Sequence, residues 1–173
     1  MAINSSSAIT YEKIYSQSHA NIYNLINTRS NVPDPADSSG NRKFVYVREP
    51  RILGRNFAGF PVIVIPSFSV SQTGNVVDRT RAMLTFDVTI RVWTQDKDSD
   101  SLGNPSGTEQ LNTISDSIIK TINNKTNRDT LRDQGMANFE IEDSDFDYSE
   151  EEGKTIYTRE FTITFSRMLQ VAS

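Results

Sequence analysis

The segment Arg81–Thr94, RAMLTFDVTIRVWT, limits what this chain can fold into more than any other stretch. Apolar residues occupy every second position, and these are Leu84, Phe86, Val88, Ile90 and Val92. The positions between them are polar: Thr85, Asp87, Thr89 and Arg91. A period of two is typical of a strand that has one face on a hydrophobic core and the other in water. We therefore predict a central, half-buried strand on which the rest of the fold is built.

Two segments show the spacing of amphipathic helices. The first, Tyr11–Ile26, places most apolar residues three or four positions apart, with Thr10 as a candidate N-cap and Ser18 inside the apolar stripe. The second begins after Thr108, another candidate N-cap, and ends near Asn124. Its apolar stripe consists of Leu111, Ile114, Ile118, Ile119 and Ile122. We expect this stripe to pack on the apolar face of the central strand, and a short turn to follow the helix.

Strand signals also precede the central strand. Lys43–Val47 predicts a short strand, and Pro61–Val70 a longer one. Pro66 has no amide hydrogen, so the second of these strands is expected to lie at a sheet edge or to bend there. The polar segment Ser71–Asn75 predicts a turn that leads into the central strand as the other half of an antiparallel pair.

The C-terminal part of the chain predicts a long β-hairpin. Phe139 and Ile141 alternate with glutamates before the tip, and apolar and polar residues alternate along Tyr157–Leu169 after it. Residues 140–155 form an acidic tip, whereas residues 30–60 form a long connecting region with one short strand. We predict a single domain, 1–173, of the α+β class. Its sheet is expected to be mostly antiparallel, with about five strands and two main helices packed on one side.

Composition narrows the classes of function. The formal net charge is −4, which argues against binding nucleic acid through general basicity. The absence of cysteine excludes disulfides, thiolate nucleophiles and cysteine-ligated zinc, and fits a reducing compartment or a virion assembled inside one. The first residues lack the basic and apolar regions of a signal peptide, and no apolar run reaches the roughly 18 residues that a membrane span requires.

The acidic stretch Glu140–Glu152 suggests a calcium loop, but its spacing does not fit one. Three aspartates take the first, third and fifth positions of an EF-hand, namely Asp143, Asp145 and Asp147. The register then demands glycine at position 6 and glutamate at position 12, where this chain has Tyr148 and Lys154. The aspartates that begin at Asp96 fail the same test. We therefore expect a solvated hairpin tip and no metal or other cofactor.

Catalytic motifs are also missing from the sequence. His19, the only histidine, lies within the first helix, where we predict a structural or surface role. The chain has no phosphate-binding loop, dinucleotide fingerprint, HExxH or GxSxG motif. The acidic hairpin could bind magnesium or act as an acid–base pair, but no lysine or histidine motif accompanies it. We therefore expect no enzyme activity, and a metal-dependent enzyme is the least favoured alternative.

Charge of the two signs is separated along the chain. Five basic residues gather between Arg42 and Arg55, and the acidic hairpin lies about a hundred residues later. One interpretation is an ordinary charged surface; the other is a complementary pair of patches that meet within one subunit or between neighbours. The candidate subunit-interface residues are Arg48, Arg51, Arg55, Glu150, Glu151 and Glu152.

The order and character of these elements resemble a known family. A first helix, the strand FDVTIRVWT, a polar loop, the helix LNTISDSIIKTI and the final strand YTREFTITFSRML are similar to the tail terminator proteins of long-tailed bacteriophages. The chain also resembles the related tail-completion and head–tail joining proteins. The resemblance covers most of the chain, from about Tyr11 to Leu169, and rests on element order and not on an invariant motif.

The resemblance implies a structural protein of the virion, located in the tail and neck and assembled in the host cytoplasm. Such a subunit forms a ring, expected to be a hexamer, that caps the tail tube, stops its polymerisation and connects it to the head. Its partners would be copies of itself, the tail-tube protein and a head-closure or neck protein, with DNA passing through the lumen without specific binding and no membrane involved. A head-closure or tail-tube subunit is the alternative within the same class.

Overall fold

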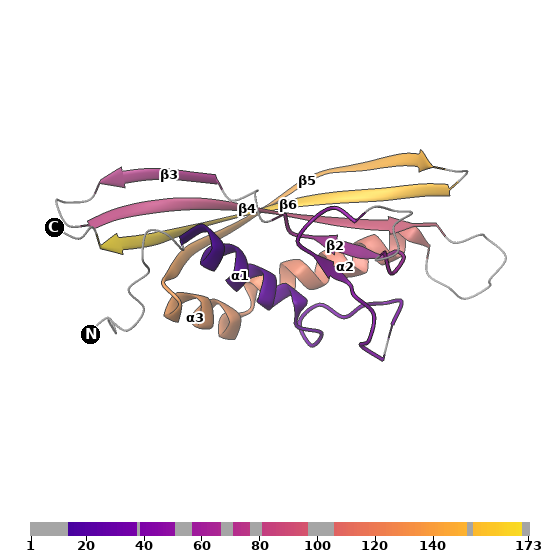
Figure 1. Ribbon diagram of the computed structural model, residues 1–173, viewed down its shortest axis with the longest axis horizontal. Coiled ribbons are helices and arrows are strands. Elements are labelled where there is room, and N and C mark those ends of the chain that lie inside the picture. Colours follow the sequence, from indigo (N-terminus) through magenta and orange to yellow (C-terminus); the bar gives the residue numbers. More distant parts are fainter. Residues whose placement is uncertain are drawn as a thin grey trace.

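The computed structural model describes residues 14–37, 39–50, 57–66, 71–76, 81–96, 106–151 and 154–170. Within these residues the chain forms three helices and six strands. The helices are α1 (Ile14–Asn27), α2 (Gly107–Asn123) and α3 (Lys125–Asp133). The strands are β1 (Val45–Tyr46), β2 (Val62–Val64), β3 (Ser71–Val76), β4 (Arg81–Gln95), β5 (Met136–Glu151) and β6 (Lys154–Gln170). The strands make one sheet with the helices on one side of it (Figure 1), which confirms the predicted α+β class.

β4 is the centre of the sheet, as the alternation of its sequence predicts. The strand order is β1-β2-β4-β6-β5, and β3 pairs with the N-terminal half of β4. β6 pairs with β4 along its whole length, from Arg81 opposite Gln170 to Gln95 opposite Ile156. Among the described strands the β1–β2 pair is parallel and the other pairs are antiparallel. The long terminal hairpin is confirmed as β5 and β6.

The predicted turn at Ser71–Asn75 is wrong, because these residues form most of β3. β2 pairs with β4 only at residues 91–93, which leaves the N-terminal half of the same edge of β4 open. β3 pairs there with residues 82–87. Ladder hydrogen bonds come from backbone groups, so a polar segment without hydrophobic alternation can form them. The extra strand brings the sheet to six strands within the described residues, against about five predicted.

Of the two alternatives predicted for the Pro66 strand, the edge position is wrong, and the strand ends at Val64, before the proline. β2 lies between β1 and β4, so both of its edges are paired. On the β1 side, the amide of Ile63 donates to the carbonyl of Phe44 at 2.9 Å, and the amide of Ile65 donates to the carbonyl of Tyr46 at 2.8 Å. Pro66 follows the last of these donors, so its missing amide hydrogen removes no bond from the ladder.

The helices differ from the prediction at two points. Ser106, not Thr108, is the N-cap of α2: its hydroxyl accepts from the Glu109 amide at 3.2 Å, and the Glu109 carboxylate accepts from the Ser106 amide at 2.9 Å. This reciprocal capping box satisfies two amides that the first turn leaves without intrahelical partners. The segment predicted as a short turn is the helix α3, which Asn124 caps. The N-cap predicted at Thr10 lies outside the described residues.

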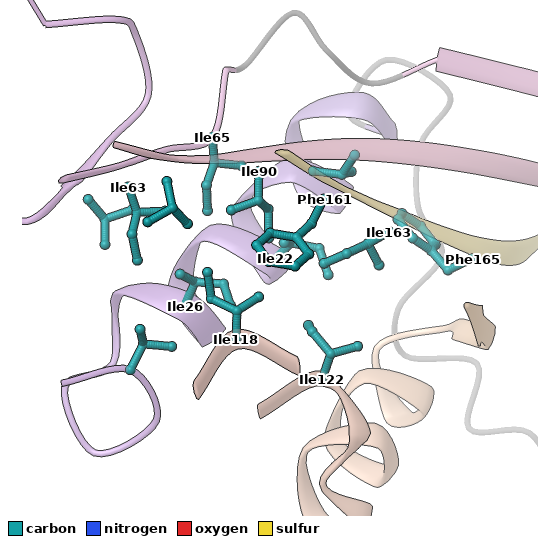
Figure 2. Packing of buried hydrophobic residues seen from close by; sticks show 14 of the residues in the cluster. Ile22, Ile26, Ile63, Ile65, Ile90, Ile118, Ile122, Phe161, Ile163 and Phe165 are labelled. Atoms are coloured by element: carbon teal, nitrogen blue, oxygen red, sulfur yellow. The ribbon is translucent and has the colours of Figure 1, made fainter. Parts of the chain in front are cut away.

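The main core lies between the sheet and the helices (Figure 2). From the sheet, β4 and β6 contribute the alternating residues that the sequence predicts, among them Phe86, Ile90 and Phe161. The α2 stripe faces them: Leu111, Ile114, Ile118 and Ile122 are all buried, while Ile119 is partly buried. The predicted packing of this stripe on the central strands is therefore confirmed. None of the described helices combines the length and the apolar character that a membrane span needs.

A buried arginine explains the polar residue in the stripe of α1. Arg167 continues the inward-facing row of β6 and is 2 % exposed. Its guanidinium donates to the Ser18 hydroxyl at 2.9 Å and to the Gln134 carbonyl at 2.9 Å. Burial lowers the pKa of Arg167. Ser18 is thus buried as a hydrogen-bond acceptor that ties α1 to β6, in place of an apolar contact.

Candidate interaction surfaces

The far half of the terminal hairpin carries exposed acidic side chains, among them Asp143, Asp147 and Glu150. We call this part, residues 143–151 of β5 and 154–160 of β6, the acidic arm. β5 forms an edge of the sheet, and its register with β6 shifts between Asp143 and Phe146. Among the described side chains of β5, the exposed carboxylates are Glu140, Glu142, Asp143, Asp147 and Glu150. A long edge strand with charged side chains and an irregularity resists indiscriminate pairing with other edges.

The acidic arm also exposes two aromatic residues. Phe146 is 43 % exposed and Tyr148 is 65 % exposed, and they stand two positions apart on the same strand. Phe146 stacks on Tyr157 of β6, with ring centroids 5.7 Å apart. The Tyr157 hydroxyl donates to Asp96 at 2.6 Å, and this hydrogen bond raises the pKa of Tyr157. An aromatic surface held in place by such contacts, and rimmed by charge, is typical of protein–protein contact sites.

Of the candidate interface residues, Arg48 and Glu150 have described side chains, and the structure places them at opposite edges of the sheet. Arg48 is exposed just after β1, at one edge of the sheet, and Glu150 is exposed on β5, at the other. Strands β2, β4 and β6 lie between them. Glu151 ends β5, opposite Lys154, whereas Glu152 lies outside the described residues. Arg51 and Arg55 also lie outside them.

The basic span, which we define as residues 42–55, exposes less positive charge than its sequence suggests. Arg42 is not part of a surface patch, because its guanidinium is turned inward to the buried carboxylate of Asp34. Next to Arg48, Glu49 pairs with Arg91 of β4 at 2.7 Å. Arg91 is also paired with Glu160 at 2.5 Å, and this contact raises its pKa. Of the described residues in the span, Arg48 and Lys43 remain exposed at the surface.

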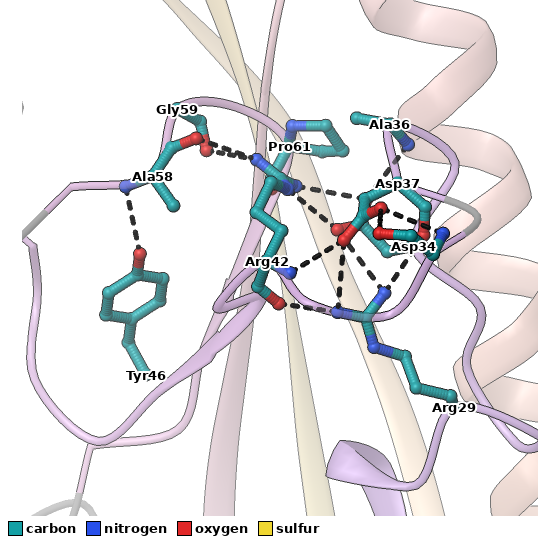
Figure 3. A network of polar contacts seen from close by, with 10 residues as sticks. Arg29, Asp34, Ala36, Asp37, Arg42, Tyr46, Ala58, Gly59 and Pro61 are labelled. Atoms are coloured by element: carbon teal, nitrogen blue, oxygen red, sulfur yellow. Dashed lines mark hydrogen bonds and ion pairs between the residues drawn. The ribbon is translucent and has the colours of Figure 1, made fainter.

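The network around Arg42 fixes the connecting region (Figure 3). The Asp34 carboxylate accepts from Arg42 Nε at 2.7 Å and from its Nη2 at 3.0 Å. The same guanidinium donates to the carbonyl of Gly59 at 2.6 Å and to that of Pro61. Asp37 accepts from the Ser39 hydroxyl and the Arg42 amide, which lower its pKa to about 2. Two loop segments far apart in sequence are thereby joined beside the sheet.

A basic cleft beside α3 was missed by the sequence reasoning. It has a volume of about 230 Å³ and is lined by Arg128, Arg132, Met136, Ala137, Asn138 and Phe139. We call it the α3 cleft. Its two arginines stand four positions apart on one side of α3, but α3 had been interpreted as a turn. Asn138 has φ of 54° at a point where the β5–β6 register shifts, a conformation that is uncommon outside glycine.

The other candidate residues of the sequence, His19 and Asp96, make hydrogen bonds within the fold. His19 is buried, and its Nε2 lies 2.7 Å from the carbonyl oxygen of Ile65, so the imidazole links α1 to the end of β2. Asp96 accepts from the Gly107 amide at 3.0 Å as well as from Tyr157, which anchors the start of α2. Among the residues that the structure describes, no three histidine, aspartate or glutamate side chains cluster closely enough to hold a metal ion.

Independence from metal remains a prediction. Adding calcium or magnesium at millimolar concentration should leave the melting temperature of the protein unchanged within error, because neither calcium register is complete. A ligand that binds only the native state must stabilise it, so a thermal shift assay is sufficient to check this. EDTA-treated protein is the matched control. A saturable rise of the melting temperature at micromolar metal would show that the acidic arm holds a cation.

No protein-family model matches this sequence, and a comparison with curated proteins gives no match.

Proposed function

We propose that this protein is a structural ring subunit of a long-tailed bacteriophage virion, a tail terminator that caps the tail tube and connects it to the head. The observation that carries the proposal is the separation of charge across the sheet. Exposed carboxylates lie along β5 at one edge of the sheet. The exposed Arg48 comes shortly after β1 in the sequence, at the other edge. Different surfaces at opposite flanks suit a heterologous interface, which closes into a ring when the rotation between subunits allows it.

The order of the elements supports the same proposal. The resemblance to tail terminators rests on a helix, a central alternating strand, a second helix and a terminal hairpin, and the fold has these elements in that order. Charge of opposite sign would fix the direction of docking and disfavour the pairing of like surfaces. Exposed ion pairs contribute only about 0–1 kcal/mol each, so apolar and aromatic contacts must supply most of the affinity.

Two alternatives remain, one in the same class of virion proteins and one among enzymes. A head-closure or tail-tube subunit would share the virion and the heterologous interface, but a tube subunit would stack into open polymers instead of one closed ring. A metal-dependent enzyme that uses the acidic arm is less favoured, because its carboxylates are spread along an exposed edge strand. The metal titration described above separates this alternative from the other two.

The mass of the purified protein tests the proposal directly. A hexamer of 19.5 kDa subunits is expected at about 117 kDa in sedimentation or light-scattering measurements. Mixing with tail tubes should add a fixed mass per tube end and stop further tube growth. A mass that increases without limit with concentration would favour the tube-subunit alternative. A monomer at every concentration, with no effect on tube growth, would contradict the proposed function.

A further inference from the structure

We infer that the acidic arm of one copy docks in the α3 cleft of a second copy, an inference that rests on the proposed self-assembly. The arm would place the Tyr148 ring against the apolar part of the cleft and the Glu150 carboxylate against its arginines. Both partners in this contact are thus copies of this chain. Within the proposed ring, the α3 cleft would thus take the receiving role that the separation of charge across the sheet assigns to the β1 edge with Arg48.

The α3 cleft has the chemistry to receive an acidic aromatic segment. The Arg128 guanidinium donates to the carbonyl of Ile122 at 3.1 Å and to the side-chain oxygen of Asn123 at 2.7 Å. Within the described residues these and the Phe139 carbonyl are its acceptors, so its charge is held by neutral oxygens alone. Arg132 has one carboxylate neighbour, Asp129 at 3.3 Å, and its side chain is 69 % exposed. Two guanidinium groups therefore face a cleft without a full set of counter-charges.

The floor of the α3 cleft and its backbone add to this fit. Met136 is buried and Phe139 is partly buried against the main core, so the cleft has an apolar side. The register of β5 with β6 shifts between Ala137 and Glu140, which takes Asn138 and Phe139 out of the regular ladder. A cleft with an apolar side, two cations and backbone groups outside the ladder suits a short segment with one aromatic ring and one carboxylate.

The acidic arm presents such a segment. Tyr148 and Glu150 are two positions apart on β5, so their side chains project from the same face of the strand. Both are exposed, and Tyr148 is the most exposed of the large hydrophobic side chains described. Tyrosine supplies a large contact area at a low cost in conformational entropy, and glutamate pairs well with the fork of an arginine.

The arm cannot reach the cleft of its own subunit. Asn138 and Glu150 belong to the same strand, and 12 residues at about 3.3 Å each separate them by roughly 40 Å. A contact between them must therefore join two copies. Because the arm and the cleft are different surfaces, the contact is heterologous, as a ring requires.

The Arg48 surface is the weaker candidate for the same role. Glu49, next in sequence, is exposed and paired with Arg91. Arg42, which the sequence assigned to the same basic span, is turned into the Asp34 network. Arg128 and Arg132, in contrast, line one cavity together.

Cross-linking between two single-cysteine variants tests the contact, because the natural chain has no cysteine. Arg132→Cys protein is mixed with Glu150→Cys protein at a concentration where the mass measurement shows assembly. A short bis-maleimide is used, since an arginine–glutamate contact leaves the two Cβ atoms farther apart than a disulfide allows. The matched control is Arg48→Cys mixed with Glu150→Cys. The inference expects the 132–150 adduct to dominate over the 48–150 adduct and over either homodimer.

A charge swap gives an independent readout. Arg132→Glu and Glu150→Arg should each weaken self-association by about five- to tenfold, and the double variant should recover most of the loss, since like charges repel and the swapped pair attracts. Lys120→Glu, an exposed reversal on α2, is the matched control and should change little. Unchanged melting temperatures would show that the variants fold.

The outcomes separate this inference from the proposed function. If assembly persists but the 48–150 adduct dominates, or the swap gives no recovery, the inference is wrong and the ring proposal stands. If the natural chain is a monomer at every concentration and has no effect on tube growth, the proposed function and this inference are both wrong.

Discussion

Replacing Ile118 by alanine is expected to lower the free energy of unfolding by about 2–5 kcal/mol. Ile118 is 0 % exposed and belongs to the core cluster that joins α2 to β4 and β6 (Figure 2). The substitution removes buried methyl and methylene groups and leaves a cavity that the surrounding side chains fill only in part. The energy lost is therefore the transfer free energy of those groups plus the cost of the cavity.

Chemical denaturation followed by circular dichroism would measure this loss. Ile118→Val keeps most of the volume and should cost only about 0.5–1.5 kcal/mol, which tests whether the effect scales with cavity size. Lys120→Ala, two positions along the same helix but exposed, should stay within about 0.5 kcal/mol of the natural chain. A loss below about 0.5 kcal/mol for Ile118→Ala would show that the stripe does not pack as Figure 2 places it.

The parts of the fold that sequence predicts are those where one physical signal dominates. β4 alternates from Leu84 to Val92 because the face that carries these two residues is buried, and the α2 stripe repeats because that face of the helix meets the sheet. In both elements local periodicity and tertiary burial agree, so the pattern is readable without a structure. The terminal hairpin is readable for the same reason.

The parts that were missed depend on partners that are distant in sequence. β3 has no hydrophobic alternation, and what makes it a strand is an open edge of β4. α3 has one buried residue, Leu131, so its apolar signal is too weak to distinguish a helix from a turn. Arg42 was assigned to a surface patch because sequence separation alone cannot show that Asp34 and the carbonyl of Gly59 surround it. The α3 cleft was missed with α3 itself.

The candidate interface is less predictable than the fold. Sequence separates acidic from basic residues, and the topology then places Glu150 and Arg48 on opposite edges of the sheet. The sequence alone could not show which cations are already paired inside the subunit. Pairing of Arg91 with Glu49 and Glu160, and of Arg42 with Asp34, removes charge that a count of residues would include.

Replacing Asp34 by alanine is expected to cost about 3–5 kcal/mol of the free energy of unfolding. The Asp34 side chain is 0 % exposed and the Arg42 side chain is 14 % exposed, so this ion pair is largely withdrawn from water. Without the carboxylate, the Arg42 guanidinium keeps its carbonyl acceptors but loses its buried counter-charge (Figure 3). A buried charge left without its partner is among the costliest defects a single substitution can introduce.

A double-mutant cycle shows whether the loss comes from the pair. Arg42→Ala and Asp34→Ala are measured singly and together by denaturant unfolding, and Asp133→Ala, exposed at the end of α3, is the control. If the pair acts as a unit, the double variant should be no less stable than Asp34→Ala alone, because removing Arg42 also removes the stranded cation. Additive losses would mean that the two residues stabilise the connecting region independently. The distinction matters for the connecting region, since the Arg42 network joins residues 34–42 to residues 58–61.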